Sequence, residues 1–159
     1  MYETFRHLHP GISLLHLHGK QKQTLRATIT QKFMAANHAY LFCTDIAARG
    51  LDFPLVDWVI QLDCPEDTDT YIHRVGRTAR FARGGKALAM LLPTELPFVE
   101  KLEAKKVPIE RISVKNGKTG SIKQQLNGMC FKDPELKYLG QKVLSLRSLQ
   151  LMQGIFMLR

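Results

Sequence analysis

The chain has 159 residues, of which 45% are hydrophobic and 23% charged, the composition of a single globular domain. No run approaches the roughly 18–20 apolar residues that cross a bilayer, so a membrane protein is not expected. Residues 1–6 lack the apolar core and small-residue cleavage site of a secretory signal. The three cysteines, Cys43, Cys64 and Cys130, have no C-x-x-C spacing, so we expect neither a metal site nor a disulfide framework.

The formal net charge of +9 is unevenly distributed. Residues 1–100 contain 11 Lys and Arg against 10 Asp and Glu, whereas residues 101–159 contain 12 against 4. A basic surface favours a polyanionic partner through phosphate contacts and counterion release. A merely solvated, lysine-rich segment would have the same composition, so charge alone leaves both interpretations open.

Apolar runs alternate with helical patterns along the first hundred residues. The patterns predict strands at 12–17, 40–43, 56–62 and 87–92, and helices at 24–36, 68–75 and 95–105. In the first of these helices, Leu25, Ile29 and Phe33 form a stripe that would pack on a sheet. Alternation of continuous apolar strands with helices predicts a parallel sheet covered on both faces. Trp58, on an apolar strand, is expected in the core.

The pattern changes after about residue 106. Ser121 with Gln124 could form a capping box, and Asp133 followed by Pro134 predicts the start of another helix. We therefore predict a sheet domain over 1–106 and a basic, partly helical extension over 107–159. Its last residues, 152–159, are expected to be a packing or disordered tail.

The first segment with chemical potential, residues 44–54, directly follows a strand. In parallel α/β sheets, ligands bind beyond the carboxyl ends of the strands. Small residues such as Gly50 let backbone amides approach a phosphate chain, and Asp52 offers a carboxylate to ribose hydroxyls. The alternative is a plain strand-to-helix turn with a solvated Arg–Asp pair.

The second segment, residues 71–80, contains three arginines at a spacing of three. Arg74, Arg77 and Arg80 would lie near one face of a helical turn. Planar, permanently charged guanidinium groups match a γ-phosphate whose charge redistributes during transfer. A solvated basic face is the alternative, but such faces usually lack the intervening Gly76 and the preceding His73.

These segments resemble conserved motifs of DEAD-box RNA helicases. Residues 44–52 resemble motif V, residues 73–80 motif VI, residues 61–65 motif Va, and residues 18–26 motif IVa. The four occur in family order with family spacing, and the resemblance covers roughly residues 3–105. It implies the C-terminal RecA-like domain of an ATP-dependent RNA helicase, an α/β fold with a three-layer parallel sheet flanked by helices.

The resemblance also implies roles for individual residues. Arg77 and Arg80 would act as arginine fingers, and His73 and Arg74 would couple ATP binding to closure of the two lobes; these four are the predicted catalytic residues. Asp45 and Arg49 would bridge motifs. Contacts to ATP are implied for Gly50, Asp52, Arg77 and Arg80, and contacts to the RNA backbone for Gly19, Gln23, Arg26 and Thr44. The cofactor would be ATP with Mg²⁺.

The chain lacks the family's phosphate loop, Asp-Glu-Ala-Asp box and Q motif, which belong to the N-terminal lobe. The Mg²⁺ ligands are therefore expected on that lobe, a required partner, and this chain alone is predicted to be inactive. The chain would begin inside the first helix of its own lobe, so a central strand with motif IV should be missing. Such a loss would expose ladder groups and apolar surface.

Residues 52–67 and 131–140 resemble nucleolar helicases of small-ribosomal-subunit assembly. This predicts a pre-ribosomal RNA partner, a role in ribosomal RNA processing, a nuclear and nucleolar location, and a monomer. The alternative is a non-enzymatic RNA- or protein-binding fragment of such a helicase. A DNA helicase is disfavoured, because residues 44–45 and 73–74 closely match the motifs of the RNA-directed family.

Overall fold

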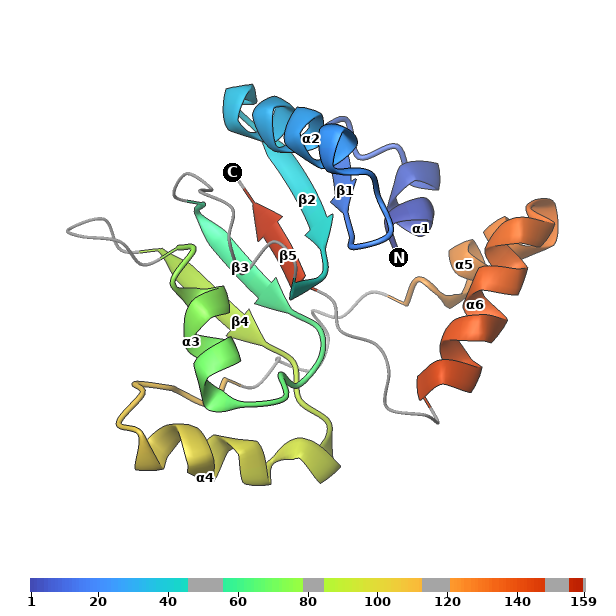
Figure 1. Ribbon diagram of the computed structural model, residues 1–159. Helices are drawn as coiled ribbons and strands as arrows, with labels where there is room; N and C mark the ends of the chain where they lie inside the picture. Colours follow the sequence, from blue (N-terminus) through green and yellow to red (C-terminus); the bar gives the residue numbers. More distant parts are fainter. Residues whose placement is uncertain (46–55, 79–84, 113–120, 148–154, 159) are drawn as a thin grey trace.

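The computed structural model describes residues 1–45, 56–78, 85–112, 121–147 and 155–158, with 143–147 and 155–158 described by their backbone alone (Figure 1). Within these ranges the elements are, in chain order, α1 (Tyr2–His7), β1 (Ser13–Leu17), α2 (Gln23–Ala35), β2 (Ala39–Cys43), β3 (Trp58–Gln61), α3 (Thr68–Val75), β4 (Lys86–Ala89), the 3-10 turn η2 (Pro93–Glu95), α4 (Pro97–Ala104), α5 (Lys123–Lys132), α6 (Pro134–Arg147) and β5 (Ile155–Leu158).

The strands form one sheet in the order β1-β2-β5-β3-β4. β1 pairs with β2 and β3 pairs with β4 in parallel, as the sequence predicts. β5 is antiparallel to both β2 and β3, so β2 and β3 run in the same direction. The four parallel strands therefore end at the same edge of the sheet, to which the arrowheads of β2 and β3 point in Figure 1.

The central strand β5 differs from what the sequence predicts. We expected ladder groups to be exposed where a central strand is missing, and residues 152–159 to be a tail. The middle of the sheet is instead occupied by Ile155–Leu158, whereas α5 and α6 are the predicted helices of the extension. The physical reason is that strand pairing is set by distant partners: four apolar residues carry no local signal that selects a sheet.

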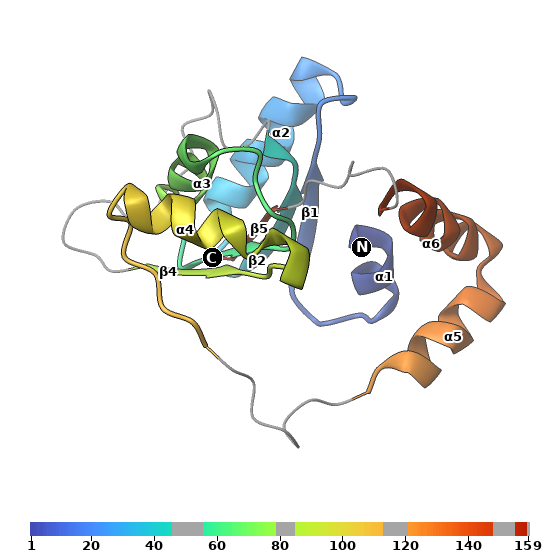
Figure 2. The same cartoon turned by 90° about the horizontal axis from the view of Figure 1, so that it is seen from below.

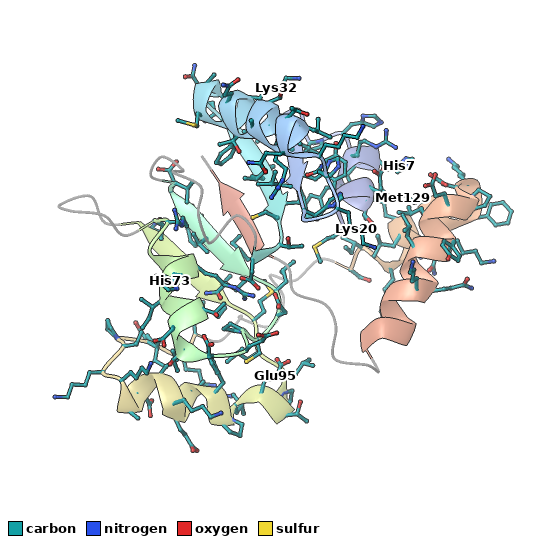
Figure 3. All side chains as sticks on the ribbon, viewed as in Figure 1. His7, Lys20, Lys32, His73, Glu95 and Met129 are labelled. Atoms are coloured by element: carbon teal, nitrogen blue, oxygen red, sulfur yellow. The ribbon has the colours of Figure 1, made fainter. Side chains whose placement is uncertain are left out.

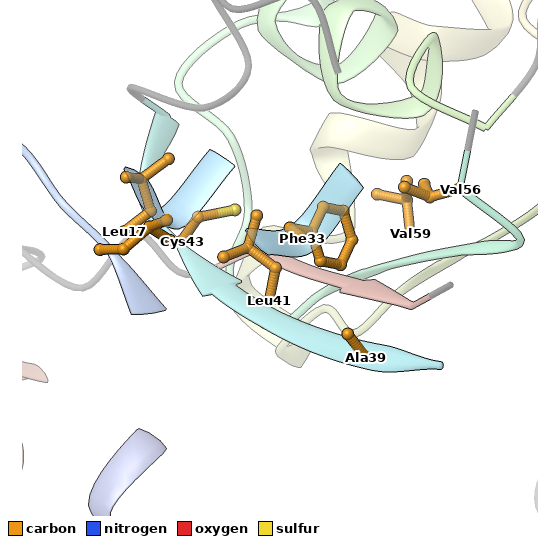
Figure 4. Packing of buried hydrophobic residues seen from close by; sticks show 8 residues of the cluster. Leu17, Phe33, Ala39, Leu41, Cys43, Val56 and Val59 are labelled. Carbon is orange, nitrogen blue, oxygen red and sulfur yellow. The ribbon is translucent and has the colours of Figure 1, made fainter. Parts of the chain in front are cut away.

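One face of the sheet packs against α2, α3 and α4. Leu17, Leu41 and Val59 point to this face, where Phe33 of α2 fills the space between them (Figure 4). Phe33, Leu41 and Val59 are fully buried. Beside this cluster, Tyr71 of α3 and Phe98 and Leu102 of α4 form a second one. In the predicted stripe of α2, Ile29 and Phe33 are buried, but Leu25 is 48% exposed because it lies on the first turn.

The opposite face is covered by α1. Because side chains alternate along a strand, His16 and Phe42 point away from α2, and the rings of Tyr2 and Phe5 meet them there. Figure 2 shows α1 on one side of the sheet and α2, α3 and α4 on the other, which gives three layers.

The alternation of side chains along β3 corrects the expectation that Trp58 lies in the core. Trp58 lies on the face away from buried Val59 and is 37% exposed, and the Lys86 Nζ lies 5.2 Å from the centre of its ring.

The helical pair α5–α6 lies beside α1. The predicted cap is confirmed, because Asp133 Oδ1 accepts hydrogen bonds from the amides of Glu135 and Leu136 at 2.9 and 3.1 Å. The other oxygen, Oδ2, lies 2.9 Å from His7 Nε2 and so joins α6 to α1. These backbone hydrogen bonds lower the pKa of Asp133. The predicted capping box at Ser121 is wrong: α5 begins at Lys123 and its first turn has no side-chain cap.

Candidate functional site

Residues predicted to bind a polyanion gather at the carboxyl edge of the sheet. Gly19 comes two residues after β1, and Thr44 directly follows β2. The backbone amide of Thr44 donates to the Leu17 carbonyl at 3.2 Å, which extends the β1–β2 pairing by one bond. Segments far apart in sequence thus lie side by side, as expected for adjacent parallel strands.

The turn from β1 into α2 is held by Gln21. Its Oε1 accepts from the His18 amide at 2.9 Å, and its Nε2 donates to the His16 carbonyl at 3.3 Å. The helix starts at Gln23 after Lys22, and no side chain caps it. The first amides of α2 are therefore available to an anion, which the helix dipole also favours.

Arg26 lies one turn into α2, at the same edge. Its Nε is buried, and among the described residues this atom has no hydrogen-bond partner. A buried donor without a partner costs free energy, so an acceptor supplied by a ligand would be stabilising here. The exposed Lys20 and Lys22 add positive charge to the turn that precedes it (Figure 3 shows Lys20 there).

Arg74 of α3 is the centre of a buried polar network. Its Nε donates to Asp45 Oδ1 at 2.7 Å and its Nη2 to Asp45 Oδ2 at 2.8 Å, a bidentate pair. Its Nη1 donates to Gln61 Oε1 at 3.2 Å and to the Asp63 carbonyl at 3.4 Å, and Nη2 lies 3.6 Å from Asp63 Oδ2. One guanidinium therefore joins α3 to the segments that follow β2 and β3.

Charge balance explains why this arginine can be buried. The side chain of Arg74 is 0% exposed, and those of Asp45 and Asp63 are 22% and 14% exposed. Burial alone would lower the pKa of Arg74, but the hydrogen bonds that it donates to Asp45 and the two carboxylate charges outweigh this effect, so the pKa is raised. The guanidinium stays charged, and its place is structural: it does not face solvent.

The segment after α3 is fastened to the start of β3. The Thr78 hydroxyl donates to the Val56 carbonyl at 2.6 Å, and the Val56 amide donates to the Arg77 carbonyl at 3.2 Å. The backbone of Gly85 runs so close to Thr78 that a Cβ there would overlap its side chain. Arg77 directly precedes the anchored Thr78 and is itself half-buried.

The structure brings some predicted residues together and separates others. Gly19 and Gln23 are exposed and Arg26 and Thr44 half-buried along one edge, whereas His73 is exposed on α3 (Figure 3). Arg74, which we grouped with the catalytic residues, is buried in the network, and the bridging place predicted for Asp45 is confirmed. Gly50, Asp52 and Arg80, like Arg49, lie outside the described residues.

Sequence reasoning missed the parts that Gln61, Asp63 and Thr78 play. Gln61 is 0% exposed at the carboxyl end of β3, although glutamine is rarely buried. A polar residue inside an apolar strand is a signal that a buried partner exists, and Arg74 is that partner. Asp63, two residues beyond, supplies the second carboxylate.

The described residues also bear on two other classes of site. No group of three His, Cys, Asp or Glu side chains among them could hold a metal ion. None of the described helices is both long and apolar enough to cross a membrane.

The family model for the helicase conserved C-terminal domain matches residues 1–82. The chain belongs to the DEAD-box helicase C-terminal domains. It is 66% identical over 142 residues to the ATP-dependent RNA helicase dbp4 of Schizosaccharomyces pombe, covering 89% of this chain and 19% of that protein.

Solved structures give the same family. DEAD-box helicase Mss116 bound to single-stranded RNA and UDP-BeF superposes with a TM-score of 0.73 at 31% identity, over 92% of this chain and 30% of that one. Domain 2 of Mss116p bound to an RNA duplex gives 0.68 at 33% identity, over 87% of this chain and 55% of that one. The fold is therefore the RecA-like one that the sequence predicts.

The chain spans about a fifth of the length of the curated relatives it matches, 19% in one and 18% in another.

Proposed function

We propose that this chain is the lobe of an ATP-dependent RNA helicase that grips the RNA backbone and completes the ATPase site of a second lobe. The observation that carries the proposal is the buried bridge from Arg74 to Asp45. It fastens the helix that leads to Arg77 onto the segment that leads from Thr44, so the nucleotide-facing and RNA-facing segments share one rigid anchor. The relatives named as RNA helicases and the RNA-bound structural neighbours support it.

On the RNA side, the amides at the start of α2, Arg26 and the Thr44 hydroxyl would contact phosphates and riboses. Gly19 lets the RNA backbone come close to the turn, and Gln23 offers a side-chain amide beside it. All of these contacts address the sugar-phosphate backbone, which carries no sequence information. We therefore expect little base specificity in this lobe and some preference for RNA over DNA where the 2′-hydroxyl is contacted.

On the ATP side, Arg77 and Arg80 would supply positive charge to the γ-phosphate, and Asp52 beside Gly50 would bind the ribose. ATP would be held between the two lobes, with Mg²⁺ ligands supplied by the N-terminal lobe. Arg74 would position Arg77 rather than touch the nucleotide, because its guanidinium is fully used inside the chain. His73, exposed on the same helix, would meet the other lobe when the two close.

For the biological substrate, we propose pre-ribosomal RNA and a nucleolar location, with the lobe acting as a monomer. The support is the resemblance of residues 52–67 and 131–140 to nucleolar helicases of small-subunit assembly. Crosslinking of the full-length helicase to RNA in cells tests this directly. Enrichment of ribosomal RNA precursors is expected, and enrichment of messenger RNA would contradict it.

The RNA-binding half of the proposal is tested with two charge removals on one helix. Arg26→Ala should weaken binding to a single-stranded RNA of any sequence and reduce the salt dependence of log K by about 0.7, the value for one phosphate contact. Lys32→Ala is the control, since Lys32 is exposed on the last turn of α2. Equal effects of the two changes would contradict the assignment of this edge, because they would indicate a diffuse charge effect.

A further inference from the structure

β5 is the hydrogen-bonded link between two halves of the sheet. β1 and β2 form one half, β3 and β4 form the other, and β2 and β3 are not neighbours. Each of them pairs with β5 instead, through the registers Cys43–Ile155 and Gln61–Ile155 at one end. Two strand spacings of about 4.8 Å therefore separate β2 from β3.

The Arg74 network spans the same gap. Its partner Asp45 lies two residues beyond Cys43, and its partner Gln61 ends β3. Because Ile155 is in register with both Cys43 and Gln61, the first residue of β5 lies between the two strands whose ends Arg74 joins. A change in β5 would therefore alter the separation that the guanidinium has to bridge.

We propose that the strand Ile155–Leu158 is a positioning element of the site: it sets the spacing between the half of the sheet that ends in Thr44 and the half that leads to Arg77. The strand thereby influences RNA binding at Gly19, Arg26 and Thr44, none of which belongs to it. The inference rests on the proposed function for its RNA readout, and its structural readouts are independent of it.

The first test compares Phe156→Pro with Phe156→Val in the full chain. Both remove the phenyl ring, but only proline removes a backbone donor from a central strand. With proline we expect fast amide exchange across Leu41–Cys43 and Val59–Gln61, alkylation of the buried Cys43 thiol, and retained protection in α2. RNA affinity should fall by about tenfold or more, which corresponds to a loss of about 1.4 kcal/mol of binding free energy. Valine should change none of these.

Rescue separates positioning from general damage. A synthetic peptide with the sequence of residues 154–159 should restore amide protection and RNA affinity to the proline variant, and a scrambled peptide should not. Normal exchange in β2 and β3 of the proline variant would overturn the inference. The inference would also be overturned if amide protection were lost in the proline variant and restored by the peptide while RNA affinity stayed the same. In that case β5 would be a structural strand only.

A second pair of variants answers the case in which the proline variant unfolds entirely. Leu158 is in register with Trp58, and directly opposed residues of antiparallel strands have Cα atoms about 4.5–5.5 Å apart, within reach of a disulfide. Trp58→Cys with Leu158→Cys should crosslink under mild oxidation, whereas Lys86→Cys with Leu158→Cys, one strand further away, should not. Absence of the first crosslink, detected by peptide mass, would refute the placement of β5. If β5 crosslinks and Arg26→Ala still has no effect on RNA binding, the proposed function fails and the strand assignment stands.

Discussion

The sharpest prediction concerns Arg74, since one side chain holds three segments together. Arg74→Ala leaves the carboxylates of Asp45 and Asp63, only 22% and 14% exposed, without their shared cation. It also leaves the buried side-chain oxygen Oε1 of Gln61 without its donor. Arg74→Lys keeps the charge but loses the fork that binds Asp45 through two nitrogens.

The expected cost follows from these contacts. Removing one partner of a buried ion pair destabilises a protein by about 3–5 kcal/mol. Because water reaches part of Asp45, the lower end applies, and we expect about 3 kcal/mol for Arg74→Ala. For a chain of this size that lowers Tm by about 6–12 °C. Arg74→Lys should lose one charge-assisted hydrogen bond, about 1.5–3 kcal/mol.

Urea unfolding of the single and double variants measures both the cost and its origin. Arg74→Met and Asp45→Asn should be strongly non-additive, with a coupling free energy of about 1.5–3 kcal/mol, because each removes the same pair. A loss below about 1 kcal/mol for Arg74→Ala, or additive single changes, would refute the reasoning. Either result would mean that the bidentate bridge does not hold α3 to the end of β2.

Three further predictions concern packing, burial and capping. Gly85→Ala should destabilise the chain by about 1–3 kcal/mol in urea unfolding, because the new Cβ overlaps the Thr78 side chain; Gly128→Ala, where nothing lies within 4 Å in helix α5, should instead stabilise by about 0.5–1 kcal/mol. The Cys43 thiol, whose pKa burial raises to about 12, should resist iodoacetamide at pH 8 until the chain unfolds, and rapid native labelling would contradict its burial. The Asp133 carboxylate, whose pKa is lowered by the backbone amides it caps, should stabilise α6 above about pH 4 and lose that effect as the pH falls through the lowered pKa. Asp133→Asn should cap at every pH and Asp133→Ala at none, measured as helix content by circular dichroism between pH 6 and 2; equal pH profiles for all three would count against the cap.

Much of the fold follows from local pattern, and the structure confirms it. β1 is a mostly apolar run and β2 a continuous one, and Ile29 and Phe33 repeat at helical spacing, so each signal lies within one element. Asp133 before Pro134 is likewise a local signal for a helix start. The placing of Asp45 as a bridge came from family resemblance rather than from spacing.

The rest could not be predicted because it depends on contacts between distant segments. Nothing within residues 155–158 specifies a central antiparallel strand, since its pairing partners lie about a hundred residues earlier. Trp58 looked like core because its neighbours are apolar, but which face it points to is fixed by the register with Lys86. The burial of Gln61 in β3 is explained only by Arg74, which reaches it from α3.

The central claim, that this chain completes the ATPase of a second lobe, is tested most directly by RNA-stimulated ATP hydrolysis. This chain would be assayed alone and then mixed with a separately made DEAD-box N-terminal lobe, using Arg77→Ala and Arg80→Ala as the test variants. Arg111→Ala is the matched control, because Arg111 is exposed in the segment that follows α4. We predict no activity from the chain alone and activity on mixing. Either test substitution should reduce that activity by a factor on the order of 10³ or more, and Arg111→Ala should leave it unchanged. A mixture that stays inactive with a folded, RNA-binding chain, or one indifferent to Arg77→Ala and Arg80→Ala, would contradict the account.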